Sequence, residues 1–518
     1  MIIDLGAGSI CTSGATPHHA RLPERRAKLT QMLQKTYACE DSSGKQSVLY
    51  QEESDDMLNS LRRLVLLGGC LALLPLGVHA QLESPAGPVP PELLQQRRAR
   101  LLERIGDGVA IVQAARPRSV EGDYPQDSDY RESNDFFYLT GLETPGASLV
   151  LIAHTSGQDS VVLYIPERDP VAEVWTGPRL GPGPEAQRVT GVDDVRGAAR
   201  FSDDVAGWLG GGRGALFVDV PMARRAECGG QPQGGPECAP ILRTLRVPEG
   251  TRVASISEHI AALRLIKDGD ELRRLREAIR ITAEAHRAAA AALEPGVWEY
   301  EIEAVIEYTF RRMGAERVGF PSIVGSGPYS TILHYDRSRR QTGAGDLVVI
   351  DIGAEYGYYT ADITRTYPVS GRFTERQRAI YDLVLSTQQA AIEAVRPGTT
   401  IGELTRVARE HMRANSGDLC RPVTCDAYFI HGLSHWLGMD VHDVGRYDVR
   451  LEPGMVLTIE PGIYIPDEGL GVRIEDDVLV TESGYELLSG DLPREADAIE
   501  RMVQQSARAL QRQGASLP

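Results

Sequence analysis

Four acidic side chains and one histidine in the second half of the chain lie inside or beside short apolar runs. They are Asp351, Asp362, His435, Glu460 and Glu475. A fold that buries the apolar runs also buries these side chains, and clustered carboxylates raise one another's pKa and oppose folding unless cations neutralise them. The chain is therefore constrained to a fold that gathers these residues around positive charge.

The first two carboxylates lie in a predicted β-hairpin at residues 345–366, with its turn around residues 355–357. Apolar residues alternate with Asp351 along the first strand, so this carboxylate points to the opposite face. Asp362 alternates with apolar residues in the same way on the returning strand. Hairpin geometry can then place the two carboxylates opposite one another.

The other two carboxylates lie in further predicted strands. Glu460 ends the apolar run at residues 455–460, and Glu475 shares a face with Arg473 within residues 471–481. Together the four carboxylates balance the charge of two divalent cations. Oxygen-rich ligation with one imidazole favours Mn²⁺, with Co²⁺ or Zn²⁺ as alternatives. Two such ions, ~3.5–4 Å apart, share a water and lower its pKa, so the pattern predicts a hydrolase.

At these residues the chain resembles the pita-bread-fold metallopeptidases, and most closely the aminopeptidase P (Xaa-Pro aminopeptidase) branch of that family. The resemblance extends from about Pro91 to Leu488. Its sharpest segments are ILHYD (332–336), VIDIGAEYGYYTADITRTYPVSG (349–371), HGLSHWLGMDVHDVG (431–445), EPGMVLTIEPGIYI (452–465) and GVRIEDDVLVT (471–481).

The resemblance implies how the ligands are shared between the two ions. Asp351 is expected to bind one ion, while Asp362 and Glu475 bridge both. His435 and Glu460 are expected to bind the other ion. Glu460 is also the expected general base, since it would contact the attacking water.

The resemblance also implies roles for side chains near the metals. His431 and His442 match histidines that position the substrate carbonyl and the leaving proline nitrogen, and His334 matches a further active-site histidine. The expected substrate-binding residues are Arg473, Phe320 and Tyr464. The phenylalanine stands where many relatives carry tyrosine, so any role of that hydroxyl is lost. The arginine and the tyrosine can alternatively support the metal carboxylates.

The chain is predicted to be an α/β (α+β) protein with two domains. Short apolar strands alternate with polar helical stretches in residues 81–258, which predicts a mixed α/β N-terminal domain. Within it, residues 130–151 (YRESNDFFYLTGLETPGASLVL) resemble the N-terminal domain of the same family. Residues 259–497 are expected to form the pita-bread catalytic domain, with helices over a curved antiparallel sheet. Residues 498–518 are expected to form a polar tail.

A secretory signal peptide is predicted at residues 57–80. Met57 is followed by a basic segment, an apolar core and a small-residue cleavage site that ends at Ala80. Because a signal acts from the N-terminus, residues 1–56 are interpreted as a non-native upstream extension. The apolar core is too short to span a bilayer. The protein is therefore expected to be secreted or periplasmic, and a lipoprotein signal through Cys70 is the alternative.

Four cysteines follow the predicted cleavage site. An even number in an exported chain permits two local disulfides, Cys228–Cys238 and Cys420–Cys425. The sequence leaves the connectivity open, and free surface thiols are the alternative.

These patterns together predict an Xaa-Pro aminopeptidase, a metallo-exopeptidase that releases the N-terminal residue from peptides with proline at the second position. One alternative is prolidase, the Xaa-Pro dipeptidase of the same fold. The other is a non-catalytic pita-bread module that binds a partner, although the complete ligand set argues against it. The net charge of −17, without a basic stripe, argues against nucleic acid as a partner. A homo-oligomer, a dimer or a tetramer, is expected.

Overall fold

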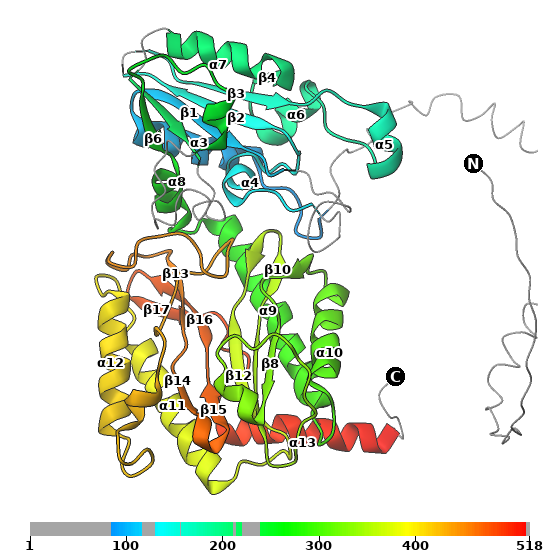
Figure 1. The fold of residues 1–518 in the computed structure, drawn as a ribbon, viewed down its shortest axis with the longest axis vertical. Coiled ribbons are helices and arrows are strands. Elements are labelled where there is room, and N and C mark those ends of the chain that lie inside the picture. The colour runs from blue at the N-terminus through cyan, green and yellow to red at the C-terminus, as the bar shows by residue number, and fades with distance from the viewer. Residues whose placement is uncertain (1–83, 117–129, 156, 211–213, 220–238, 514–518) are drawn as a thin grey trace, which may run out of the picture. The chain divides into compact units, whose positions relative to one another are not determined.

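The computed structural model describes residues 84–116, 130–155, 157–210, 214–219 and 239–513. The predicted signal peptide (57–80), the segment 1–56 and the predicted Cys228–Cys238 bridge lie outside the described residues. All described residues belong to one unit, Val78–Pro518. Within it, an N-terminal domain built on one large sheet precedes a catalytic domain of smaller antiparallel sheets (Figure 1).

The N-terminal domain contains a six-stranded mixed sheet in the order β4-β3-β2-β1-β5-β6. Its strands are β1 (Gly108–Gln113), β2 (Ser148–Ala153), β3 (Ser160–Ile165), β4 (Asp194–Gly197), β5 (Ala215–Val218) and β6 (Arg252–Ser255). β1 pairs antiparallel with β2 and parallel with β5. These three central strands are almost entirely buried, which explains their continuous apolar composition.

Helices cover both faces of this sheet. They are α3 (Pro91–Ile105), α4 (Asn134–Thr140), α6 (Pro184–Thr190) and α7 (Phe201–Gly210), whereas α5 (Pro170–Thr176) buries none of its residues. The alternation along β1 assigns the faces: Ala110 belongs to the apolar cluster that includes Leu101 of α3, whereas Ile111 belongs to the cluster that includes Val205 of α7. The predicted mixed α/β domain is therefore present.

Two helices carry the chain from the first domain into the second: α8 (Ser257–Arg264) and α9 (Gly269–Ala292). The Asp268 side chain accepts hydrogen bonds from the backbone N–H groups at the start of α9, and Glu271 bonds back to the N–H of Asp268. This capping box fixes the point at which the long helix begins.

The catalytic domain packs helices against short antiparallel sheets. Its strands are β7 (Arg317–Val318), β8 (Ile323–Ser326), β9 (Leu347–Ile352), β10 (Ala354–Tyr356), β11 (Tyr359–Thr360), β12 (Ile363–Pro368), β13 (Val456–Ile459), β14 (Gly462–Ile465), β15 (Leu470–Arg473), β16 (Asp476–Thr481) and β17 (Gly484–Leu487). Its further helices are α10 (Glu299–Arg312), α11 (Glu375–Glu393), α12 (Ile401–Ala414) and α13 (Ala496–Gln513). α9 and α10 pack beside β8 to β12, and α11 beside β13 to β15 (Figure 1).

The predicted hairpin exists as the antiparallel pair β9 and β12, but its register differs from the simplest expectation. Thr364 lies opposite Asp351, and Asp362 precedes β12 by one residue. The two carboxylates are therefore diagonal neighbours and not directly opposite. The connection contains the extra short strands β10 and β11, whose turn uses positive φ angles at Gly357 and Tyr358.

The C-terminal helix α13 crosses the domain boundary that the sequence suggested at residue 497. Its Ile499 and Val503 side chains are buried in the main apolar cluster of the catalytic domain. The start of the predicted polar tail is thus part of the catalytic domain. Cys420 and Cys425 form a disulfide, as predicted, in the segment ahead of His431. Within the described ranges, no helix has the length and apolar content needed to cross a membrane.

Candidate active site

All five predicted ligands line one cavity of about 600 Å³ in the catalytic domain. Asp351 lies on β9, Asp362 just before β12, Glu460 just after β13, and Glu475 between β15 and β16. His435 lies on the irregular segment that precedes β13. The cavity is also lined by the predicted site residues His334, His431, His442, Phe320 and Arg473.

His435 is the centre of the carboxylate cluster. Its Nε2 atom lies 3.2 Å from Asp362 Oδ2, 3.5 Å from Glu460 Oε1 and 3.9 Å from Glu475 Oε1. Its Nδ1 atom lies 3.1 Å from the carbonyl oxygen of Trp436. A bond from Nδ1–H to that carbonyl leaves Nε2 with a free lone pair directed at the carboxylates, as a metal ligand requires.

The carboxylates are short of positive charge. Burial and the neighbouring carboxylates raise the pKa of Asp362 and Glu475 well above their ordinary values. Burial likewise raises the pKa of Glu460 to about 7, although His435 and Arg473 act in the opposite direction. Among the described residues, Asp351 Oδ1 and Asp362 Oδ1 are buried without a hydrogen-bond partner.

This donor set fits divalent cations. Asp362, His435 and Glu475 offer ligand atoms that all lie within 4.8 Å of one another. Glu460 lies next to this group, with its Oε1 3.5 Å from His435 Nε2. Asp351 is close enough for its charge to raise the pKa of Asp362. Bound cations would coordinate the unpartnered carboxylate oxygens and would lower the raised pKa values of these carboxyl groups.

Arg473 lies behind the carboxylates and uses its donors on them and their neighbours. Its Nη2 donates to Asp351 Oδ2 at 2.6 Å, its Nη1 to Tyr464 Oη at 3.0 Å, and its Nε to Thr364 Oγ1 at 3.1 Å. Thr364 in turn donates to Glu475 Oε2 at 2.6 Å. The guanidinium therefore holds two of the candidate ligands, and only 3% of the residue is exposed.

Tyr464 does not line the cavity, in contrast to its predicted place among the substrate contacts. Its side chain is buried behind the wall, where its hydroxyl accepts a hydrogen bond from Arg473 and lies 2.8 Å from His431 Nε2. Because this hydroxyl is already engaged on both sides, it orients the histidine and the arginine.

The three predicted histidines differ in their surroundings. His431 Nδ1 lies 2.8 Å from the carbonyl of Gly432 and 3.5 Å from Glu460 Oε2, and burial lowers the pKa of His431 to about 4. His442 stands at the cavity edge, where its ring meets that of His435 edge-on with centroids 4.3 Å apart. His334 lines the same cavity and, like His442, is exposed. A neutral His431 therefore faces the candidate base.

Two residues that support the ligands were missed by sequence reasoning. Thr364 links Arg473 to Glu475, and the buried Asp477 accepts a hydrogen bond from the backbone N–H of Asp362 at 3.2 Å. Thr364 is two residues from Asp362, so the strand period of two could have identified it as a neighbour on the same face.

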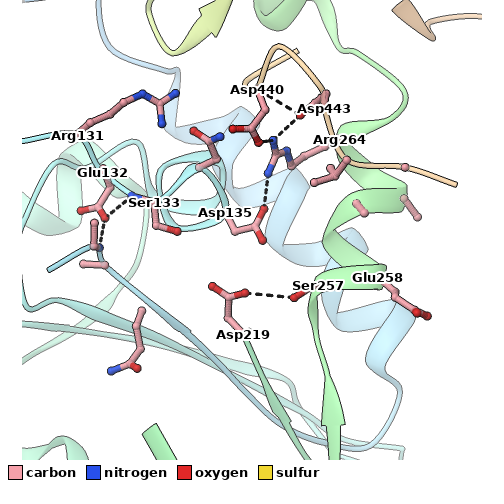
Figure 2. A pocket seen from close by; sticks show the side chains of 18 of the residues that line it. Arg131, Glu132, Ser133, Asp135, Asp219, Ser257, Glu258, Arg264, Asp440 and Asp443 are labelled. Carbon is pink, nitrogen blue, oxygen red and sulfur yellow. Dashed lines mark hydrogen bonds and ion pairs between the residues drawn. The ribbon is translucent and has the colours of Figure 1, made fainter. Parts of the chain in front are cut away.

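A second cavity, of about 1140 Å³, adjoins the first. His442 and Tyr447 line both cavities. The second cavity lies between the N-terminal domain, which contributes residues 131–135, and the catalytic-domain segment 442–447 (Figure 2). The space beside the candidate site thus continues beyond the ligand cluster.

Comparisons with known proteins place both domains. Residues 273–482 match the model of metallopeptidase family M24, and residues 94–217 match the model described as aminopeptidase P, N-terminal domain. The chain is 38% identical to the Xaa-Pro aminopeptidase of Escherichia coli (strain K12) over 79% of this chain and 97% of that protein. It is 34% identical to the Xaa-Pro aminopeptidase of Haemophilus influenzae over 80% and 98% of the two chains.

Solved structures agree with these matches. The structure of aminopeptidase P from E. coli with the inhibitor Pro-Leu superimposes with a TM-score of 0.72 at 35% identity, covering 82% of this chain and 100% of the other. A putative aminopeptidase P from Bacillus anthracis gives a TM-score of 0.74 at 30% identity, covering 81% and 99%.

Proposed function

The chain belongs to metallopeptidase family M24, in its aminopeptidase P branch, and from this membership we propose that it releases the N-terminal residue from peptides with proline at the second position. The observation that carries the proposal is one cavity lined by four carboxylates and His435, with three of the carboxylates within 3.9 Å of His435 Nε2. The relatives are named Xaa-Pro aminopeptidases, which supports this activity over that of a prolidase. The intact ligand set also argues against a purely binding module.

The five residues Asp351, Asp362, His435, Glu460 and Glu475 would hold two divalent cations. Bound there, the cations would polarise the scissile carbonyl and lower the pKa of a water. Mn²⁺ is the ion we favour, because the donor set is rich in carboxylate oxygen and contains a single imidazole. Co²⁺ and Zn²⁺ accept the same donors.

Glu460 is the carboxylate best placed to take a proton from the attacking water. Its side chain is 16% exposed, against 11% for Asp351, 6% for Asp362 and 2% for Glu475, so it faces the open cavity most. His431 stands beside it: Nδ1–H donates to the Gly432 carbonyl at 2.8 Å and Nε2 accepts from the Tyr464 hydroxyl, which fixes the ring with Nδ1 3.5 Å from Glu460 Oε2. His442 and His334, which are exposed and line the cavity, have rings that can contact the substrate.

Preference for longer peptides would follow from the second cavity. A dipeptidase must bind the substrate's C-terminal carboxylate with a fixed cation, and Arg473 is already bonded to Asp351, Thr364 and Tyr464. An aminopeptidase must instead leave the space past proline open, and the cavity beyond His442 does so.

A peptide panel tests the proposed function. We expect Xaa-Pro-Xaa tripeptides and longer peptides to be cleaved after the first residue with a higher kcat/KM than Xaa-Pro dipeptides. Replacing proline by alanine at the second position should cost about 2 kcal/mol or more of transition-state binding, because the ring fills a shaped pocket. A panel in which Gly-Pro or Ala-Pro outperforms every longer peptide would reassign the enzyme to prolidase.

Export is part of the proposal and is supported by the signal-like sequence at residues 57–80. The mature protein is then secreted or periplasmic and begins at Gln81. N-terminal sequencing of protein from its native host checks this. A terminus upstream of Met57, or a lipid on Cys70, would contradict cleavage after Ala80.

A homo-oligomer, a dimer or a tetramer, is also proposed. Helix α5 exposes three large apolar side chains, Val171 at 73%, Val174 at 81% and Trp175 at 86%, and none of its residues is buried. Adjacent exposed apolar side chains of this kind are typical of protein interfaces. Light scattering should show an assembly larger than a monomer that Trp175→Glu weakens, and a wild-type monomer at micromolar concentration would rule the oligomer out.

A further inference from the structure

The position of the His442 ring in the site is set mainly by the backbone of the loop that carries it. Its ring packs edge-on against His435, and within the described part of the chain no hydrogen bond is made to the ring. A histidine that must meet a substrate at a fixed point therefore needs the segment around it to be held firmly.

The next residue, Asp443, provides that hold. Its backbone N–H donates to the carbonyl of Trp436 at 2.9 Å, and its side chain is almost fully buried. The carboxylate accepts from Arg264 Nη2 at 2.5 Å and from Lys267 Nζ at 3.2 Å. It also accepts from the backbone N–H of Asp440 at 3.4 Å, which closes the loop that contains His442.

Arg264, at the end of α8, joins this loop to the N-terminal domain. Only 2% of the residue is exposed. Its Nη1 donates to Asp135 Oδ1 on α4 at 2.7 Å, while its Nη2 donates to Asp443 and, at 3.1 Å, to Asp440 Oδ2. Figure 2 shows the guanidinium between Asp135 on one side and the two loop carboxylates on the other.

An arginine of the N-terminal domain itself also reaches the same loop. Arg131 donates to the carbonyl oxygen of Met439 at 3.2 Å and to Glu355 at 2.9 Å. The loop of residues 439–443 is thus bonded to Arg131 of the N-terminal domain at one end and to Arg264, which Asp135 of that domain holds, at the other.

We propose that Arg264 is a positioning residue for His442: with Asp135 on one side and Asp443 on the other, it uses the N-terminal domain to fix the loop that presents this histidine to the substrate. The inference rests on the proposed function, because it concerns the same reaction. It gives the N-terminal domain a role in turnover that the ligand cluster alone does not reveal.

The test is a double-mutant cycle on the metal-loaded enzyme with an Xaa-Pro-Xaa tripeptide. Arg264→Met should lower kcat about ten- to a hundredfold, with little change in KM and with bound metal unchanged, because a displaced catalytic group loses that much rate. Arg264→Lys should recover part of the loss. In a His442→Ala background, Arg264→Met should have almost no further effect, since both changes act through one group.

Arg97→Met is the matched control. Arg97 is as buried as Arg264 and likewise ties the N-terminal domain to the linker, through Asp268 at 2.8 Å, but it does not touch the His442 loop. It should lower thermal stability while leaving the kcat of metal-loaded protein within about twofold. If Arg264→Met does not fold, Asp135→Asn provides the same cycle with a smaller loss.

The outcomes separate this inference from the proposed function. An equal loss from Arg264→Met with and without His442 would overturn the positioning role and leave the peptidase function standing. A wild-type enzyme inactive on these tripeptides would overturn the function. In that event a crystal structure of Arg264→Met still decides the inference: a displaced 439–443 loop with unmoved ligands supports it, and an unmoved loop refutes it.

Discussion

Replacement of Glu475 by alanine is expected to abolish both metal retention and peptidase activity. The Glu475 carboxylate lies 3.9 Å from His435 Nε2 and is held by Thr364, so its loss removes one of the negative charges that balance the cations. Asp362→Ala should have the same effect. Glu460→Gln should keep the fold while lowering kcat on the order of 10²-fold or more, because a general base is lost. Metal analysis and a tripeptide assay on the same samples measure both effects.

Glu482→Ala is the control, because Glu482 is exposed just after β16 and lies outside the cavity. It should retain metal and activity. Full activity of wild-type protein after exhaustive chelation would be incompatible with a metal-dependent mechanism, whatever the variants do.

Replacement of Arg365 by methionine is expected to destabilise the catalytic domain by about 3–5 kcal/mol, as breaking a buried ion pair does. Arg365 and Asp476 are fully buried and lie 2.7 Å apart. The guanidinium also donates to the backbone carbonyl of Glu475 at 2.6 Å and to that of Thr364 at 2.9 Å. Its removal leaves the buried Asp476 carboxylate with the more distant Arg494 cation, 3.6 Å away, and takes a donor from the carbonyls of Thr364 and Glu475.

Urea unfolding at fixed metal concentration measures this loss. Arg276→Met removes an exposed pair with Glu486, in which both side chains are 44% exposed, and should cost no more than about 1 kcal/mol. Adding Asp476→Leu to Arg365→Met should recover part of the stability, because the uncompensated charge disappears. Equal effects of the two single arginine variants would show that burial of the pair is unimportant.

The ligands could be found in the sequence because each carboxylate lies inside or beside a short apolar run. That local signal does not depend on where the strands end up. The register of β9 against β12 was harder to predict from the sequence. The short strands β10 and β11 and the left-handed turn at Gly357 and Tyr358 shift Asp362 away from the position opposite Asp351. The local pattern did not show how the five ligands are shared between two ions, and the family resemblance supplied that assignment.

The residues that hold the site in place could not be predicted from the sequence, for a different reason. Arg264 meets Asp135 across 129 positions and Asp443 across 179 positions of the chain. No periodicity of one element predicts contacts between side chains so far apart. For Tyr464 the sequence left substrate contact and structural support both open, because the partners on its buried side, His431 and Arg473, become visible only in the packed fold.

The pKa values of Asp362, Glu460 and Glu475 are raised by burial in the metal-free fold, so these carboxyl groups keep their protons to a higher pH than ordinary carboxyl groups do. Raised folded-state pKa values favour the folded state at low pH, and for Glu460 that benefit fades as the pH climbs from about 4.5 to about 7. Loading the ions displaces those protons. We therefore expect metal binding to release protons and to tighten as the pH rises, because the ions and the protons compete for the same carboxylates.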